Sequence, residues 1–202
     1  ILVSSRTRMD LGTASAMAKE LTAFLKKQPG VKRVAVAGSL RRLRETVGDL
    51  DLLATAAGGG KITARFAKAS FSDRVLVCGQ TKASILTKEG IQVDLRVVAP
   101  ESFGAALQYF TGSKEHNVRL RERAARKGLK VNEYGVFRLK SGKSVAGREE
   151  EDVYKALGLP WIPPEMREDT GEIEEAARGQ LPTPVSIKDL KGDFHVHTNA
   201  SD

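Results

Sequence analysis

The stretch "VAGSLRRLRETVGDLDLLA", residues 36–54, decides the interpretation of this chain. Its second half is a Leu-rich run that contains Asp49 and Asp51. Residues i and i+2 of a strand point to the same face, so the two carboxylates lie side by side. Burying two like charges in an apolar strand is costly unless a cation lies between them. We therefore expect a divalent metal ion here, and Mg²⁺ prefers carboxylate oxygens together with phosphates.

A phosphate-binding turn precedes the two aspartates. Gly38 lets the backbone approach a phosphate closely, and Ser39 adds an N–H and a hydroxyl. If a short helix begins there, its N-terminus attracts anions. Arg41 or Arg42 can then hold a phosphate through two parallel hydrogen bonds. Gly48 leaves room for a triphosphate beside the carboxylates.

A third carboxylate, Asp94, comes from "GIQVDLRVV", residues 90–98, whose apolar residues alternate as in a half-buried strand. Three carboxylates on two adjacent strands can hold two metal ions about 4 Å apart, the arrangement used for in-line phosphoryl displacement. An isolated Asp-x-Asp pair is most often a surface feature. Here the apolar strand and the preceding turn favour a metal site.

The whole chain has 202 residues and a net charge of +8, which favours an acidic partner: nucleic acid, nucleotide phosphates or a membrane surface. No apolar run approaches the roughly 20 residues of a membrane span, and no signal-peptide pattern opens the chain. Because the sequence begins at Ile1, we expect a fragment of a longer protein. The lone Cys78 fits a reducing cytosol, and its apolar neighbours predict a buried core thiol.

The hydrophobic periodicities predict an α+β fold, with a mixed sheet and helices on one side of it. Two helices separated by a Gly-Ser break, a hairpin and a small helix follow the sheet region. A run rich in proline and acid is then typical of a linker. The expected domains are residues 1–99, 100–159, 160–191 and 192–202.

The motifs together resemble a known family. The residues that match the nucleotidyltransferase signature of the polymerase beta superfamily are Gly38, Ser39, Asp49, Asp51 and Asp94. The segments "TGSKEHNVRLR", residues 111–121, and "VNEYGVF", residues 131–137, narrow the resemblance to DNA polymerase family X. The end "DFHVHTNASD", residues 193–202, is similar to the opening of the polymerase and histidinol phosphatase (PHP) domain of the bacterial branch.

The resemblance implies a nucleotidyltransferase palm in residues 1–99. Asp49, Asp51 and Asp94 would bind two Mg²⁺ or Mn²⁺ ions, and Asp94 would also help to activate the primer 3′-hydroxyl. The groups implied to contact the β- and γ-phosphates are Ser39, Arg42 and the backbone at Gly48. Residues 100–159 would form a small α/β subdomain that closes on the nascent base pair.

Within that subdomain the resemblance assigns Tyr109, Phe110 and Gly112 to the nucleotide sugar. The alternative for the two aromatic residues is a place in the core of their helix. Asn117 and Arg121, four residues apart on one helix face, would contact the incoming base and the template minor groove.

A second set of arginines on the same helix is a stripe spaced i, i+4 and i+7. Its members, Arg119, Arg123 and Arg126, form either a solvated face or a contact with the DNA backbone. The summed positive charge of the region favours salt-dependent DNA binding.

Two further features concern Gln92, which departs from the family pattern, and the residues at the end of the chain. Gln92 stands where the animal enzymes carry an arginine two residues before the third aspartate; it can donate a hydrogen bond but adds no charge. At the end of the chain, His195 and His197 would face one way on a strand, with Asp202 as a further metal ligand. In a complete PHP domain such residues would serve Zn²⁺ or Mn²⁺; the set here is incomplete.

The sequence therefore predicts a bacterial, cytoplasmic family X DNA polymerase that fills gaps in DNA repair. Its partners would be gapped or primer-template DNA and a deoxynucleoside triphosphate (dNTP), with no membrane, and we expect a monomer. One alternative is a template-independent nucleotidyltransferase. The other is a basic DNA-binding platform, with little or no polymerase activity, that positions a PHP 3′–5′ exonuclease or phosphoesterase domain.

Overall fold

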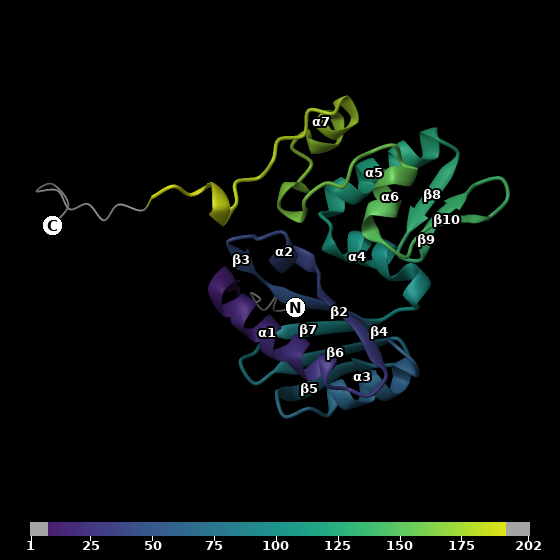
Figure 1. Cartoon of the computed structure of the whole chain (residues 1–202). Helices are drawn as coiled ribbons and strands as arrows, with labels where there is room; N and C mark the ends of the chain where they lie inside the picture. Colours follow the sequence, from purple (N-terminus) through teal and green to yellow (C-terminus); the bar gives the residue numbers. More distant parts are fainter. Residues whose placement is uncertain (1–7, 193–202) are drawn as a thin grey trace, which may run out of the picture.

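A computed structural model describes residues 8–192. It has two parts, which Figure 1 shows one above the other: a five-stranded sheet with its helices, and a mostly helical part that contains a small sheet. The strand order of the large sheet is β2-β4-β7-β6-β5. These strands span Val31–Val36 (β2), Asp49–Ala56 (β4), Gln92–Val97 (β7), Lys82–Thr87 (β6) and Ser72–Cys78 (β5). The expected mixed α+β architecture is confirmed.

The sheet is mixed because β4 and β7 are parallel, whereas every other neighbouring pair is antiparallel. Helices α1 (Leu11–Lys26) and α3 (Gly59–Ala67) cover one face. A separate two-stranded ladder pairs β1 (Met9–Asp10) with β3 (Thr46–Val47). The parallel pair matters for function because it brings Asp49, Asp51 and Asp94 onto neighbouring strands.

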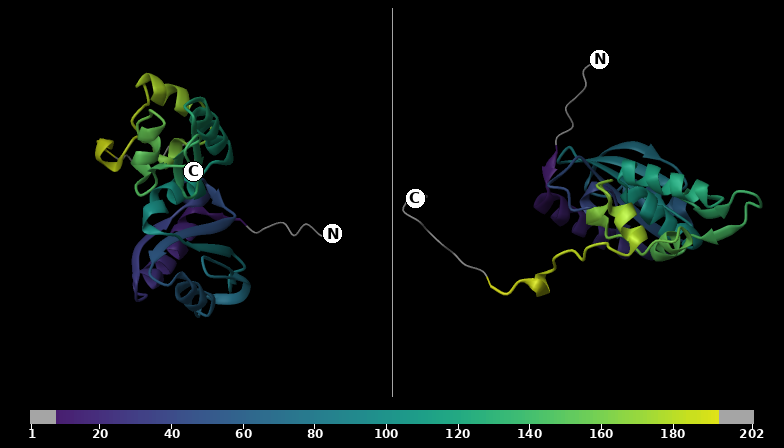
Figure 2. Two further views of the ribbon diagram at one scale, coloured as in Figure 1. Left: turned by 90° about the vertical axis from the view of Figure 1, so that its right-hand side faces the viewer. Right: turned by 90° about the horizontal axis from the view of Figure 1, so that it is seen from above.

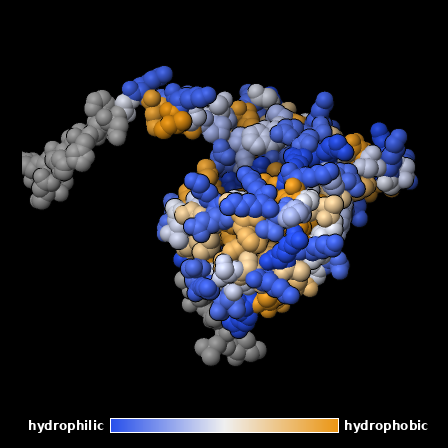
Figure 3. Space-filling view, turned by 60° about the horizontal axis from the view of Figure 1, so that its bottom comes forward, coloured by the Kyte–Doolittle hydropathy of each residue, from blue (hydrophilic) through white to orange (hydrophobic). Residues whose placement is uncertain are grey.

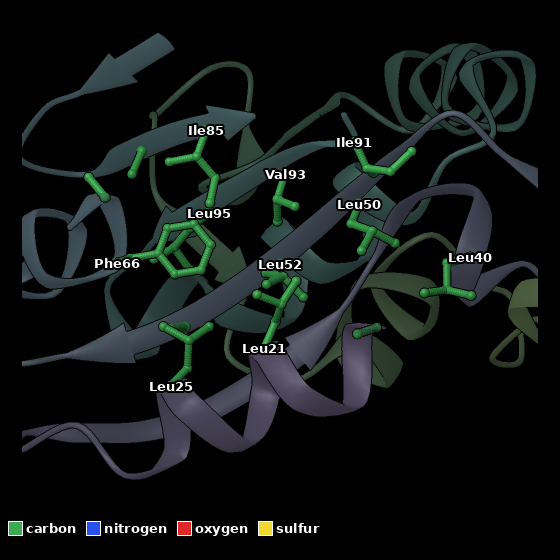
Figure 4. Packing of buried hydrophobic residues seen from close by; sticks show 14 of the residues in the cluster. Leu21, Leu25, Leu40, Leu50, Leu52, Phe66, Ile85, Ile91, Val93 and Leu95 are labelled. Carbon is green, nitrogen blue, oxygen red and sulfur yellow. The ribbon is translucent and has the colours of Figure 1, made fainter. Parts of the chain in front are cut away.

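The core of the first part lies between α1, α3 and the large sheet. Figure 4 shows Leu21 and Leu25 of α1 pointing toward Leu52 of β4, with Phe66 of α3 beside them. Alternation along β4 sends Leu50 and Leu52 into this core and leaves Asp49 and Asp51 on the other face. The apolar set therefore fixes which face the carboxylates occupy.

Cys78 corrects one prediction. The thiol is exposed, not buried. It ends β5, an edge strand that has a hydrogen-bonded neighbour on one side only, and Val75, Leu76 and Val77 are also about half exposed. An apolar run predicts burial only when the strand lies inside its sheet, and the run itself carries no information on strand order.

The second part begins with a short 3-10 helix (Pro100–Ser102) and then α4 (Phe103–Thr111) and α5 (Lys114–Arg126). A three-stranded sheet follows, in the order β10-β9-β8. Its strands are β8 (Leu129–Asn132), β9 (Gly135–Arg138) and β10 (Ser144–Ala146), and α6 (Glu150–Ala156) comes next. Gly104 lets α4 meet α6, because a Cβ at this position would lie 2.1 Å from the carbonyl carbon of Glu149.

The expected linker, residues 160–191, is only partly extended. A 3-10 helix (Pro164–Met166) and α7 (Glu172–Arg178) lie in its first half, and Ile162, Ile173 and Ala176 belong to the same buried cluster as Tyr154. Residues 182–192, with the 3-10 helix Ile187–Asp189, run away from the body (Figure 2). Residues 160–181 are therefore packed structure and not a free connection.

The surface in Figure 3 is mostly hydrophilic, with smaller apolar areas between the charged side chains. No helix within residues 8–192 is long and apolar enough to cross a membrane.

Candidate functional site

The turn between β2 and α2 (Gly38–Arg41) lies directly against a carboxylate. Gly38 has φ +65°, and a Cβ there would lie 2.5 Å from Oδ2 of Asp51. The Ala37 N–H donates to the carbonyl of Asp51 at 2.8 Å, which ties the turn to β4. Because α2 has only four residues, the local N–H groups of the turn, and not a long helix dipole, are what an anion would meet.

Three aspartates share one face of the β4–β7 pair. Asp51 lies opposite Asp94 in the parallel register, and Asp49 lies opposite Gln92. Burial raises the pKa of Asp51, and the neighbouring Asp49 and Asp94 raise it further, to about 7. Arg96 and Lys82 act in the opposite direction without outweighing these effects. At Asp51 the neighbouring negative charges thus outweigh Arg96 and Lys82, and a cluster of carboxylates fits a divalent cation chemically.

Asp94 is engaged by two side chains. Gln92 Nε2 donates to Oδ1 at 3.0 Å, and Lys82 Nζ lies 3.0 Å from Oδ2. Burial raises the pKa of Asp94, but the polar groups of Ser84, Gln92 and Lys82 outweigh it and hold the pKa below its usual value. Gln92 thus keeps the orienting hydrogen bond, and Lys82, which the sequence reading missed, adds the positive charge that a glutamine lacks.

No group of three or more His, Cys, Asp or Glu side chains in the described part of the chain is already gathered as a metal cage. Metal binding by the three aspartates stays a prediction. His195, His197 and Asp202 lie outside the described residues.

Ten of the predicted residues meet around one open cavity of about 390 Å³. They are Gly38, Ser39, Arg42, Asp49, Asp51, Tyr109, Phe110, Gly112, Asn117 and Arg121. Thr111 and Lys114, which the sequence reading did not select, complete the lining. Asp94 and Gly48 are not part of this lining; Gly48 lies against Arg8, whose Nη1 would be 3.1 Å from a Cβ there.

The helical side of the cavity is built at the junction of α4 and α5. Asn117 Nδ2 donates to the carbonyl of Tyr109 at 2.7 Å, and its Oδ1 accepts from Gln108. Tyr109 and Phe110 pack edge to face with ring centres 5.1 Å apart, and Arg96 from β7 lies 4.2 Å over the Phe110 ring. Both aromatic residues are half-buried, and Phe110 also packs against the buried cluster that contains Leu53 and Phe103, so their contact with a sugar stays a prediction.

The arginine stripe of α5 has intramolecular partners. Arg119 pairs with Glu174 and lies 3.5 Å from Asp169. Arg123 Nε donates to the carbonyl of Leu157 at 2.8 Å. Arg126 is exposed, near Glu122, and Arg121 lines the cavity. DNA contact by the stripe remains a prediction, and the geometry favours Arg121 and Arg126 over Arg119 and Arg123.

Known proteins resemble this chain along most of its length. The DNA polymerase beta thumb family model matches residues 106–168. A Bacillus subtilis (strain 168) protein named DNA polymerase/3'-5' exonuclease PolX is 34% identical over 198 residues, which is 96% of this chain and 34% of that protein. The chain belongs to DNA polymerase family X.

Two further family X relatives differ in length. Repair DNA polymerase X of African swine fever virus (strain Badajoz 1971 Vero-adapted) is 29% identical over 144 residues, 67% of this chain and 82% of the viral protein. DNA polymerase lambda of Rattus norvegicus is 30% identical over 168 residues, 69% of this chain and 29% of the rat protein. The chain therefore spans about a third of the bacterial and rat proteins and most of the viral one.

The family X thumb match ends at residue 168, beyond the boundary that we expected at residue 159. This agrees with the packing of Ile162 and of the buried Arg167 against the helical part. The boundaries themselves stay predictions.

Proposed function

We propose that this chain is the catalytic core of a DNA-directed DNA polymerase that adds a deoxynucleotide to a primer 3′-hydroxyl and fills gaps in DNA repair. The observation that carries the proposal is the meeting of ten predicted residues, from both parts of the chain, around one cavity beside Asp51. The palm side offers carboxylates and a phosphate-sized turn, and the helical side offers aromatic and amide groups for a nucleoside.

Each group has a role that follows from its chemistry. The backbone and hydroxyl of Ser39, with the guanidinium of Arg42, bind and orient the β- and γ-phosphates. Tyr109 and Phe110 exclude water from the sugar, and Arg121 reaches the template side. Asp49, Asp51 and Asp94 would hold two Mg²⁺ or Mn²⁺ ions. When bound, such ions stabilise the attacking and leaving oxygens of an in-line displacement at the α-phosphate, with pyrophosphate as the leaving group.

Primer extension on a one-nucleotide-gapped duplex tests the proposal, with Mg²⁺ and Mn²⁺ in separate reactions. We expect templated addition of one nucleotide by the wild type. Asp94→Ala should lower the rate by about 10³-fold or more, because metal-held charge contributes several kcal/mol. Asp73→Ala is the matched control: Asp73 is exposed on β5 and makes no hydrogen bond or ion pair within residues 8–192.

The other outcomes separate the alternatives. Extension of a template-free primer at the same rate would identify a template-independent nucleotidyltransferase. Binding of gapped DNA without extension in either metal would contradict a polymerase and leave a DNA-binding platform.

A further inference from the structure

The segment that follows α6 is anchored at the rim of the nucleotide cavity by Arg167. This side chain is wholly buried. Its Nη1 donates to Oε1 of Glu150 at 2.7 Å, its Nε donates to the carbonyl of Ile162 at 2.8 Å, and its guanidinium lies 5.0 Å over the ring of Tyr154. A buried, charge-paired arginine with this many contacts has essentially one conformation, so the backbone at residue 167 is fixed.

The same residue touches the cavity wall through its backbone. The Ser113 N–H, next to the cavity residue Gly112, donates to the Arg167 carbonyl at 3.0 Å. The following residue, Glu168, is thereby held beside the cavity with 24% of its side chain exposed. Its Oε1 accepts a hydrogen bond from Nε of Arg42 at 2.8 Å.

Arg42 is held on two sides. Its Nε donates a hydrogen bond to Glu168, and its Nη1 donates to the carbonyl of Thr111 at 2.5 Å. Within residues 8–192 Nη2 forms no hydrogen bond, so this nitrogen remains for a ligand oxygen. The Arg42 side chain is only 14% exposed, and the residue lines the cavity. An arginine that binds phosphate loses less conformational entropy when its fork is already oriented.

We propose that Glu168 is a positioning residue for triphosphate binding: it holds the Arg42 guanidinium in the orientation that presents Nη2 to the cavity. That a triphosphate is the ligand rests on the proposed function. Glu168 lies in a segment that sequence patterns assign to a linker, 126 positions from Arg42 along the chain. The buried Arg167 next to it fixes where Glu168 lies.

The negative charge of Glu168 acts against this role, because it repels a triphosphate. Arg44 Nη1, 3.8 Å from the same carboxylate oxygen, offsets part of that charge. The two effects are separable by substitution. Glu168→Gln removes the charge and keeps an oxygen that accepts from Nε. Glu168→Asp keeps the charge, but its side chain is one methylene shorter, so the carboxylate oxygen lies farther from Nε of Arg42.

The experiment measures dNTP affinity by fluorescence titration on gapped DNA whose primer ends in a dideoxynucleotide, so that no chemistry follows binding. Steady-state KM and kcat on the extendable primer are measured in parallel. We expect Glu168→Ala and Glu168→Asp to raise both Kd and KM about three- to tenfold, since a hydrogen bond to a charged group is lost, with kcat nearly unchanged. Glu168→Gln should stay close to the wild type.

Glu165→Ala is the matched control. Glu165 is exposed in the same segment and makes no hydrogen bond or ion pair in the described chain, so its removal changes the net charge equally and should leave Kd unchanged. Unchanged or tighter binding by Glu168→Ala and Glu168→Asp would overturn the proposal. Tighter binding by Glu168→Gln would overturn it as well, because charge and not orientation would then be the effect. If the wild type binds no dNTP and extends no primer, the proposed function fails together with this inference.

Discussion

The half-buried Asp51 and the buried Glu150, one in each part of the molecule, are carboxylates with opposite surroundings. Asp51 lies in β4 next to Asp49 and Asp94, and its pKa is raised to about 7. Glu150 begins α6 and accepts hydrogen bonds from Arg41, Arg167 and the indole of Trp161. Burial by itself raises the pKa of Glu150, but the two arginines outweigh it and lower the pKa to about 2.

The difference shows what each carboxylate is for. Both groups lose water, so the sign of the neighbouring charges decides which protonation state the fold favours. Glu150 is compensated inside the chain and joins the two parts through Arg41 of α2. Asp51 lies beside two other carboxylates that raise its pKa, the pattern of a functional site.

Removal of the structural carboxylate should have the largest effect on stability. Glu150→Ala leaves Arg41 and the wholly buried Arg167 without their shared anion, and we expect a loss of about 3–5 kcal/mol in the free energy of unfolding. Urea unfolding followed by circular dichroism measures it. Glu151→Ala, an exposed acid in the same helical turn, should cost well under half of that; equal losses for the two variants would contradict the comparison.

Acid should weaken the same network. The folded pKa of Glu150, about 2, lies below its ordinary value of 4.5, so the folded state binds the proton less readily than the unfolded state. The stabilisation is complete above about pH 4.5 and is lost as the pH falls toward 2, by about 2–3 kcal/mol. Unfolding midpoints of the wild type and Glu150→Gln across this range test it: the two curves should converge at low pH, and parallel curves would exclude Glu150 as the source.

The functional carboxylate should behave in the opposite way. Asp51→Asn removes one of three crowded negative charges, so without divalent metal we expect the variant to be about 1–2 kcal/mol more stable than the wild type near pH 8. Thermal unfolding in EDTA measures this. Added Mg²⁺ should stabilise the wild type more than the variant and reverse the order. A variant that is less stable in EDTA would show that Asp51 is not repelled by its neighbours.

The parts of the site that sequence could predict are those set by local periodicity. The spacing of Asp49 and Asp51 and the alternation around Asp94 fix their faces, because a strand has a period of two wherever it lies. Strand order has no such local signature. For that reason Cys78 was predicted to be buried, whereas its thiol is exposed. The local periodicity of the sequence likewise does not predict contacts between residues that are far apart along the chain.

Three such contacts change the picture of the site. Lys82 of β6 forms an ion pair with Asp94, and Glu168 of the expected linker accepts a hydrogen bond from Arg42. Arg119 forms an ion pair with Glu174 of α7. The buried His116, whose ring joins Glu172 at 2.6 Å to the Tyr154 hydroxyl at 3.0 Å, also depends on a partner 56 positions away. A polar residue on a helix carries no local sign of whether it meets solvent, DNA or a distant carboxylate.

The smallest effect should come from the neighbour of Glu150. Glu149 also pairs with an arginine of the large sheet, through two hydrogen bonds from Arg33 of β2 at 2.8 and 2.9 Å, but both side chains are more than 40% exposed. Water and salt screen such a pair, so Glu149→Ala should cost less than about 1 kcal/mol, and less still at high salt. A double-mutant cycle with Arg33→Ala isolates the pair from the stacking of Arg33 on Phe103. Two adjacent glutamates that bridge the same junction would then differ severalfold, because Glu150 is buried between several donors and Glu149 is exposed with one arginine partner. A loss for Glu149→Ala as large as that for Glu150→Ala would contradict this comparison.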